Sequence, residues 1–510
     1  MSFLSSVPFL PALFAQTDGF VRPEVDWHAF APDLVVAGAL VVVLMADLFL
    51  PEERKGLLPS LAGLGLLAAL IPVVTLAVDG ADRTMFGGAY AVDNFALVLK
   101  ALFLVAGYVV VLLSTNYIAE GDYAEGEWYV LLLSSILGMT AMASARDLIS
   151  IFIALELLSI PAYLLAGWRK VDPKSNEAGA KYYLMGVFAT AVLLYGMSLL
   201  FGVAGSTLLS DIGEALRTES QPFITLAIVF VVAGLGFKVS AVPFHTWAPD
   251  TYEGAPTPLT AFLSVLSKAA GFVALMQLVV LAFPARADVV EPLVWVLAAA
   301  SMTIGNVIAL RQTNVVRMLA YSGISQAGFM LAPLAVVGDI GDDAVRAIVT
   351  YLVIYAAMNL GAFTVVMAVA RRTGSGEIRS FAGLFEYAPA LAVAMSAFLF
   401  SLAGIPPLGG WLAKFVVFRA VIDANNAAAF VLAVVMAVNA VIAIGYYANV
   451  AREMWMSPPP DEERERMPVR VPVSLTTALT LTGALTLAFG VTQWATELGD
   501  MATFVAAAVP

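Results

Sequence analysis

The stretch that decides the fold runs from Gly234 to Lys268 and begins Gly234-Leu-Gly-Phe-Lys-Val-Ser-Ala-Val-Pro-Phe-His-Thr-Trp-Ala-Pro-Asp-Thr-Tyr-Glu-Gly-Ala-Pro-Thr-Pro258. One apolar segment ends near Lys238 and breaks around Pro243, and a second apolar segment follows Pro258 and carries Lys268. A charge inside a membrane segment is costly, and a broken helix leaves backbone groups that protein or water must satisfy. The stretch therefore predicts a membrane helix that is interrupted for a functional reason.

The composition is that of an integral membrane protein. Of the 510 residues, 61% are hydrophobic and 13% are charged, whereas a soluble chain has roughly 25% charged residues. The chain has no cysteine, which excludes disulfides, cysteine-ligated iron–sulfur clusters and c-type haem from this polypeptide. His28 and His245 are too few and too far apart in sequence to indicate a metal site, and the net charge of −12 argues against a nucleic-acid surface.

Apolar runs of about 20 residues, each long enough to cross a hydrocarbon core of about 30 Å, recur along the whole chain. No polar stretch is long enough to fold separately, so one all-α polytopic membrane domain is expected over residues 1–510. The longest polar insert, residues 452–470, is expected to be a solvated loop. We predict about fourteen membrane segments, at 30–50, 57–78, 92–115, 126–144, 147–168, 177–203, 222–242, 256–283, 290–309, 314–337, 343–370, 386–404, 426–450 and 471–495.

The basic residues of the loops predict the orientation. Cytoplasmic loops are enriched in Lys and Arg, and placing both termini outside the cytoplasm puts fourteen basic residues in inner loops and six in outer segments. The inner residues are Arg54, Lys55, Arg169, Lys170, Lys174, Arg311, Arg317, Arg371, Arg372, Arg379, Arg452, Arg464, Arg466 and Arg470, and the outer ones are Arg22, Arg83, Arg146, Arg217, Arg286 and Arg346. Both termini are therefore expected on the non-cytoplasmic side.

Most of the lysines, unlike most of the arginines, lie within or at the ends of apolar segments. They are Lys100, Lys181, Lys238, Lys268 and Lys414. A desolvated lysine can give up its proton, whereas arginine stays charged, so the buried cations are of the titratable kind. The alternative is snorkelling, in which the amine reaches the membrane surface. Snorkelling is most reasonable for Lys100, and least so for Lys268, which lies about twelve residues into its segment.

The fifth segment carries a carboxylate in its apolar centre. Glu156 is the only acid in the middle of any predicted segment, because Asp33 and Asp47 lie near the ends of the first. An ionised carboxylate in hydrocarbon needs a cation or water, and lysines are the cations available at this depth. In such a pair a proton on one group changes the proton affinity of the other, as a proton relay requires. The alternative is a static pair that only fixes helix register.

Two segments are predicted to be broken. The seventh breaks around Pro243, and the twelfth breaks at Gly404-Ile-Pro-Pro-Leu-Gly-Gly410 and resumes with Lys414. Broken helices at matching places in two halves indicate an internal repeat with a site near the middle of the membrane. Because the breaks lie five segments apart, equivalent elements would run in opposite directions. The alternative is that prolines merely kink two ordinary packed helices.

The motifs around these lysines resemble those of a known family. The stretch Gly234–Pro258, followed by Ser267-Lys268 and by Gly404-Ile-Pro-Pro-Leu-Gly-Gly-Trp-Leu-Ala-Lys414-Phe, is similar to the antiporter-like membrane subunits of the proton-translocating NADH–quinone oxidoreductase, respiratory complex I. These share ancestry with subunits of multisubunit Na+/H+ antiporters and of membrane-bound hydrogenases. Lysine at position 414 resembles subunits N and L more than M. The chain is expected to leave no room for the lateral helix of subunit L, so the resemblance is to subunit N.

The resemblance implies a fold and a set of roles. It implies about fourteen helices, with segments four to eight (126–283) and nine to thirteen (290–450) as inverted repeats. It pairs Glu156 with Lys238. It makes Lys268 the central proton-carrying residue and Lys414 the proton-carrying residue that leads toward the exit. His245 would bridge protons just after the break, since an imidazole titrates near neutral pH. Lys181 would lie near the Glu–Lys pair.

The resemblance also implies partners and a function. NADH, FMN, iron–sulfur clusters and quinone would be bound by other subunits, so no cofactor, metal or redox reaction is expected in this chain. Its neighbours would be lipid, subunit M on one side and the small subunits K and J on the other, in the inner (plasma) membrane of a bacterium. The expected function is proton translocation coupled to quinone reduction. The alternatives are a subunit of a multisubunit Na+/H+ antiporter and a structural spacer whose buried charges serve packing only.

Overall fold

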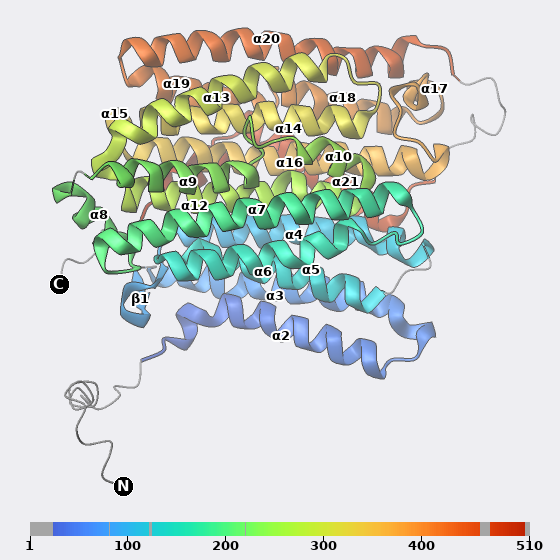
Figure 1. Cartoon of the computed structure of the whole chain (residues 1–510). Helices are drawn as coiled ribbons and strands as arrows, with labels where there is room; N and C mark the ends of the chain where they lie inside the picture. The colour runs from blue at the N-terminus through green and yellow to red at the C-terminus, as the bar shows by residue number, and fades with distance from the viewer. Residues whose placement is uncertain (1–23, 81, 122–124, 220, 460–469, 505–510) are drawn as a thin grey trace.

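Long apolar helices that run side by side dominate the computed structural model (Figure 1). The structure describes residues 24–80, 82–121, 125–219, 221–459 and 470–504. Within these residues, 12 helices are long and apolar enough to cross a membrane, and two further apolar helices are shorter. This confirms the predicted all-α membrane fold. The count of fourteen crossings and the division into inverted repeats stay predictions.

The predicted segments coincide with helices within a few residues at most ends. The uninterrupted long helices are α2 (Trp27–Phe49), α3 (Leu58–Asp79), α4 (Asn94–Glu120), α5 (Glu125–Ser144), α6 (Leu148–Ala166), α7 (Pro173–Ala204), α13 (Ala287–Ala309), α14 (Val315–Leu331), α16 (Asp342–Thr373), α20 (Ala427–Met456) and α21 (Val473–Val491). The eighth segment is a composite of α11 (Thr257–Phe262), the π-helical turn η3 (Leu263–Ser267), α12 (Lys268–Gln277) and a second π-helical turn, η4 (Leu278–Ala282).

Both segments that were predicted to break are interrupted. The seventh consists of α9 (Pro222–Lys238) and α10 (Trp247–Gly254), and the twelfth consists of α18 (Pro389–Ala403) and α19 (Gly409–Asp423). Gly404 ends α18 in a left-handed conformation with φ 92°, and its N–H returns to the carbonyl groups of Phe400 and Ser401. Glycine adopts this conformation without steric cost, which makes it a common helix terminator.

Short elements gather at the two ends of the bundle. At one end lie α8 (Leu209–Thr218), α15 (Val337–Ile340) and the antiparallel hairpin of β1 (Arg83–Met85) and β2 (Tyr90–Val92), whereas α17 (Leu384–Tyr387) lies at the other (Figure 1). None of them has the length of a membrane segment, so segment prediction missed them. Residues 460–469 and Arg22 lie outside the described residues, as does most of the predicted polar loop, and the orientation stays a prediction.

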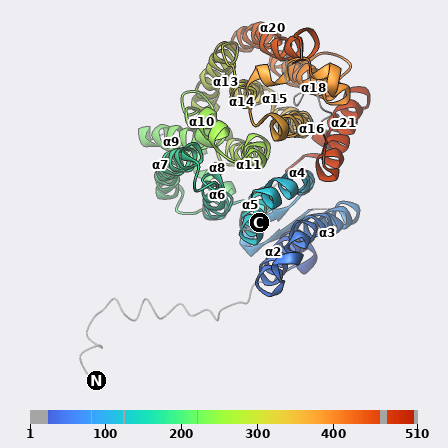
Figure 2. The same ribbon diagram turned by 90° about the vertical axis from the view of Figure 1, so that its right-hand side faces the viewer.

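Helix α16 forms the centre of the second half of the bundle. Seen end on, it lies among α14, α18, α20 and α21 (Figure 2). Its most apolar stretch is entirely buried, whereas that of α7 is only 28% buried. Since hydrocarbon can cover an apolar helix as well as protein can, α7 is free to face lipid. Helix α16 instead supplies a protein-lined interior, where polar groups can be satisfied.

Gly410 allows α19 to approach the end of α18. A Cβ at Gly410 would overlap the carbonyl oxygen of Ser401, and the Gly410 N–H donates to Ser401 Oγ at 3.0 Å. We expect Gly410→Ala to destabilise the protein by about 1–3 kcal/mol through overpacking against backbone. Its melting temperature in detergent should fall. Gly202→Ala, in α7 with open space around it, is the matched control and should melt like the wild type. Unchanged melting of Gly410→Ala would contradict this close approach.

Candidate functional site

Lys238 ends α9 at the first break and is 4% exposed. Its ammonium group donates to Ser159 Oγ at 2.7 Å and to the hydroxyl of Tyr182 at 3.4 Å. The predicted direct ion pair with Glu156 does not form, because the hydroxyl of Ser159, on the next turn of α6, takes the hydrogen bond. Glu156 still attracts Lys238 electrostatically across this gap. Its Oε1 atom is buried and has no hydrogen-bond partner among the described residues.

The backbone groups freed by the first break are satisfied by side chains. Trp247 donates its indole N–H to the carbonyl of Phe237 at 3.0 Å, and Ser301 Oγ accepts the N–H of Val242 at 2.9 Å. Such partners are required where a helix stops inside a membrane. They fix Lys238 at the carboxyl end of α9, where the helix dipole favours a cation.

His245 lies in this break, as the motif predicted. Its side chain is half-buried, and Nδ1 has no hydrogen-bond partner among the described residues. No cluster of His, Cys, Asp or Glu that could hold a metal ion occurs in the part of the chain that the structure describes.

Lys268 follows the π-helical turn η3 and is 1% exposed. Its ammonium group donates to the carbonyl oxygen of Gly323 on α14. A Cβ at Gly323 would lie 3.0 Å from this nitrogen and 3.2 Å from the hydroxyl of Tyr355, so glycine leaves room for the cation. The stem of Lys238 packs against Gly271, one turn after Lys268 on the same helix.

Lys414 lies just after the second break, in the first half of α19, whereas Lys238 ends the helix before the first break. Its ammonium group donates to the carbonyl of Ala403, the last residue of α18, at 2.7 Å. The ring of Phe329 on α14 lies 5.0 Å from it. Lys238 therefore ends α9 itself, whereas Lys414 reaches back with its ammonium group to the carboxyl end of α18. None of the three central lysines has a carboxylate within ion-pair distance in the described part of the chain.

A polar cluster that the sequence did not reveal lies between Lys268 and Lys414. Gln326, one turn after Gly323 on α14, donates to the carbonyl of Leu402 at 3.0 Å and to the hydroxyl of Tyr447 at 3.2 Å. The hydroxyl of Tyr351 donates to Gln326, and Ser322 and Tyr447 are hydrogen bonded at 2.5 Å. This cluster could have been suspected from the amide and hydroxyl side chains inside predicted membrane segments, because buried polar groups need hydrogen-bond partners.

Lys181 is placed differently from the prediction. Its side chain is 40% exposed and forms ion pairs with Asp250 at 2.7 Å and with Glu177 at 2.5 Å. The next residue, Tyr182, is the one that reaches Lys238. The prediction that Lys181 lies near the Glu–Lys pair did not include these carboxylates. Glu177 lies one turn earlier on the same helix, whereas the approach of Asp250 depends on the position of α10 after the break, which was not visible in the sequence.

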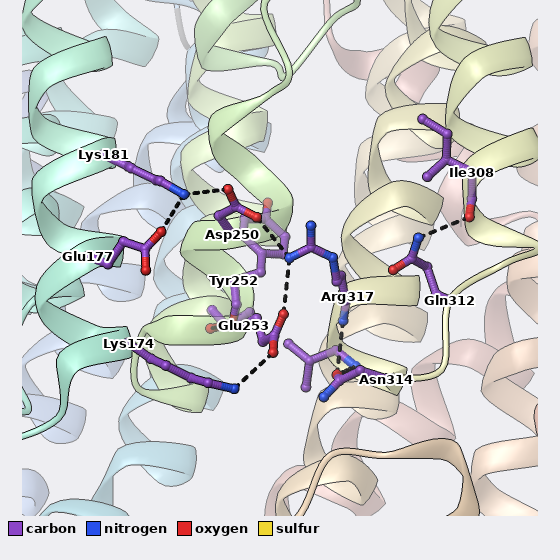
Figure 3. A network of polar contacts seen from close by, with 12 residues as sticks. Lys174, Glu177, Lys181, Asp250, Tyr252, Glu253, Ile308, Gln312, Asn314 and Arg317 are labelled. Carbon is purple, nitrogen blue, oxygen red and sulfur yellow. Dashed lines mark hydrogen bonds and ion pairs between the residues drawn. The ribbon is translucent and has the colours of Figure 1, made fainter.

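Lys181 belongs to a network that joins three helices (Figure 3). Arg317 of α14 bonds Asp250 at 2.8 Å and Glu253 at 3.0 Å, both on α10, and Glu253 bonds Lys174 of α7 at 3.2 Å. Lys174 and Glu253 also line a polar cavity of about 570 Å³. The network ties α10, and with it the far side of the break, to helices of both halves of the bundle.

Lys100 does not snorkel. It is fully buried in α4 and lies 2.9 Å from Asp33 of α2. The pair could have been identified from the depth of the two residues in the membrane. Asp33 lies six positions after Trp27, where α2 begins, and Lys100 lies six positions after Asn94, where α4 begins. Two helices that start at the same membrane surface bring such positions to the same level.

Known proteins resemble this chain over most of its length. Residues 145–441 match the family model "NADH:quinone oxidoreductase/Mrp antiporter, TM". NADH-quinone oxidoreductase subunit N of Trichlorobacter lovleyi is 38% identical over 465 residues, which cover 90% of this chain and 94% of that protein. The same subunit of Geobacillus kaustophilus is 39% identical over 487 residues, which cover 93% and 95%.

Solved structures resemble the fold. A chain of respiratory complex I from Thermus thermophilus with bound Aureothin has a TM-score of 0.74 and 30% identity, covering 90% of this chain and 97% of that one. A chain of the Mrp complex from Dietzia sp. DQ12-45-1b has a TM-score of 0.81 and 21% identity, covering 94% and 97%, and this likeness shows the fold alone. With the subunit N relatives and the matching family model, the chain belongs to the NADH-quinone oxidoreductase subunit N family of antiporter-like membrane proteins.

Proposed function

We propose that this chain moves protons across the membrane as a subunit of an NADH–quinone oxidoreductase and carries out no redox reaction itself. The observation that carries the proposal is the placing of Lys238, Lys268 and Lys414, each beside an interruption of a helix. Each donates to a neutral oxygen rather than to a carboxylate. Lys238 and Lys268 are buried and Lys414 is partly buried. A lysine held in this way can exchange its proton without leaving an ion-pair partner unpaired. The names of the subunit N relatives support the complex.

The proposed relay starts at Glu156 and Lys238. Energy released by quinone reduction elsewhere in the complex alters the attraction between these two charges, and Lys238 then gives up its proton. A neutral Lys268 amine accepts that proton through intervening water, since the stem of Lys238 packs against Gly271, one turn from Lys268. The proton moves on through the polar cluster around Gln326 to Lys414. His245 exchanges protons at the break. Lys181 helps to hold α10 in place through its ion pair with Asp250.

The remaining components of the proposal follow from the family. NADH, FMN, iron–sulfur clusters and quinone are bound by other subunits, and this chain holds no cofactor. Subunit M lies on one side and subunits K and J on the other. The chain lies in the plasma membrane of a bacterium with both termini on the non-cytoplasmic side. The repeats cover residues 126–283 and 290–450, and the occurrence of one interrupted helix with a nearby lysine in each range supports this division.

The antiporter alternative predicts ion exchange without a redox partner. To separate the two functions, the chain is deleted from its host and restored on a plasmid, and inverted membrane vesicles are prepared from both strains. We expect restoration to recover proton uptake driven by NADH oxidation, together with quinone reductase activity. Proton exchange against added Na+ in the absence of NADH, with no effect of deletion on NADH-driven uptake, would contradict the proposal.

A further inference from the structure

A buried charge cluster that the relay does not use lies between α2, α4 and β2. Lys100 is 0% exposed, Asp33 is 4% exposed and their charged groups are 2.9 Å apart. The hydroxyl of Tyr90 closes a triangle, because it donates to Asp33 Oδ2 at 2.5 Å and accepts from Lys100 at 2.7 Å. Each corner of this triangle is a group that can gain or lose a proton. A buried pair adds little net stability, so ionisable groups inside a membrane domain call for a functional explanation.

The charges around this triangle balance. Asp93, which caps α4, and Arg146, which precedes α6, form a second pair at 2.6 Å, and both act electrostatically on Lys100. Two carboxylates therefore oppose two cations, and the cluster is neutral when all four groups are ionised. A third buried carboxylate, Asp147, follows Arg146 and accepts the N–H groups of Ile149 and Ser150 as the cap of α6. Nearer the surface, Asp26 pairs with Arg83 and Asp79 lies 3.8 Å from His28, whereas Glu125 and Glu127, in the first turn of α5, lie at the opposite end.

One atom of the cluster is open. Asp33 Oδ1 is buried and has no hydrogen-bond partner among the described residues. A buried carboxylate oxygen without a partner loses its hydration without compensation. This cost disappears if a proton or a hydrogen-bonding water binds there. If a proton binds to this oxygen, Asp33 becomes neutral and the net charge of the cluster rises from zero to one positive charge.

A thin aromatic cover separates the cluster from the surface. The rings of Phe30 and Phe86 meet the ring of Tyr90 edge to face at 5.5 and 6.4 Å, and Phe86 is 43% exposed. Phe86 stands at the tip of the hairpin with φ 55°, followed by Gly87 and Gly88 at 65° and 92°. A bulky residue is unfavourable in this left-handed region, so packing on Tyr90 is what holds Phe86 there. The cover is one side chain thick.

We propose that Asp33, Tyr90 and Lys100 form a second proton-binding site, loaded beneath the β1–β2 hairpin. A proton from water binds Asp33 Oδ1 and converts the carboxylate into a carboxylic acid, while Lys100 stays an ammonium. Unloading reverses this step. Tyr90 also allows an internal shift: Lys100 gives a proton to the tyrosine oxygen as the tyrosine gives its own to Asp33, which leaves a neutral amine and a neutral acid.

The hairpin links this site to the relay. The N–H of Arg146 donates to the carbonyl of Ala89 at 2.9 Å, and Tyr90 forms a bridge with Ala145. These residues directly precede Asp147, which caps α6, the helix that carries Glu156. A role in proton translocation therefore rests on the proposed function, whereas the binding of a proton at Asp33 does not.

Infrared difference spectra of the assembled complex test the site. Spectra are recorded across a pH titration and between resting enzyme and enzyme turning over NADH. We expect a carboxylic-acid carbonyl band that is lost in Asp33→Asn and shifted in Tyr90→Phe, which keeps the ring and the direct Lys100–Asp33 contact. Arg83→Gln is the matched control, because the partly buried Arg83–Asp26 pair at 2.8 Å ties the same hairpin to the same helix. It should leave the band unchanged.

A purely static pair would give a different result. If no band at any pH or during turnover is lost in Asp33→Asn, the cluster is structural and the proposal is overturned. Should a single substitution prevent assembly by leaving a buried charge unpaired, the double variant Asp33→Asn with Lys100→Met removes both charges and must also lack the band. Normal pumping by Glu156→Gln with the Asp33 band intact would overturn the relay alone and leave this site standing.

Discussion

Replacing Lys268 by methionine is expected to abolish NADH-driven proton translocation through this chain while the complex still assembles. Methionine keeps most of the length of the side chain and removes the ammonium group that bonds the carbonyl of Gly323 on α14. Lys268 stands between the other two central lysines and is 1% exposed, so bulk water cannot replace it. Losing a positioned proton-transfer group slows its step by roughly 100-fold or more. The rate of proton uptake by inverted vesicles measures the effect.

The control for this variant is a lysine outside the relay. Lys170 is exposed in the loop between α6 and α7, so Lys170→Met removes the same charge without touching the buried helices. Its rate of proton uptake should equal that of the wild type. Native-gel electrophoresis reports assembly of both variants. If an assembled Lys268→Met complex translocates protons at the wild-type rate, Lys268 is not part of the relay.

Glu156→Gln is expected to produce the second largest loss. Glu156 is the carboxylate that attracts Lys238, although Ser159 takes the direct hydrogen bond. Glutamine keeps the shape of the Glu156 side chain and removes its negative charge. The ammonium form of Lys238 is then no longer favoured by a nearby carboxylate. We expect proton translocation and coupled NADH oxidation to fall together by roughly tenfold or more. Glu156→Asp, which keeps the charge, should recover part of the rate.

Glu127→Gln is the matched control for the carboxylate. Glu127 is exposed in the first turn of the neighbouring helix α5, and its loss should leave both rates unchanged. Ser159→Ala provides an independent check, because it removes the neutral acceptor of Lys238 and keeps the charge of Glu156. Equal rates for Glu156→Gln and wild type would show that Lys238 works without the carboxylate.

The membrane fold could be predicted because its signal is local. A run of about 20 apolar residues is written in one stretch of sequence, and so is a proline break. The predicted segment 343–370 lies within α16, Asp342–Thr373. Elements that obtain their stability from packing had no such signal. The amphipathic helix α8 buries Leu209, Ile212 and Leu216 against the end of the bundle, and the hairpin of β1 and β2 is too short to recognise.

The sequence shows which lysines lie in apolar segments, but not which residues they contact. A lysine in an apolar run is visible in one sequence, but its partner depends on how distant helices pack. Lys238 and Ser159 are 79 residues apart, and Lys100 and Asp33 are 67 apart. The first half of the seventh segment, α9, ends at Lys238 rather than near residue 242, which places the lysine at a helix end. The sequence does not single out Gln326, because one amide in an apolar segment looks like an ordinary buried polar group.

Ordered water along the path is the most direct evidence for or against the relay. A structure of the assembled complex at a resolution that shows water should be determined for the resting enzyme and for the enzyme during turnover. The relay predicts waters that connect Lys238 to Lys268, and waters among Gln326, Tyr351 and Tyr447 that connect Lys268 to Lys414. A continuous dry gap between these lysines in every state would contradict it.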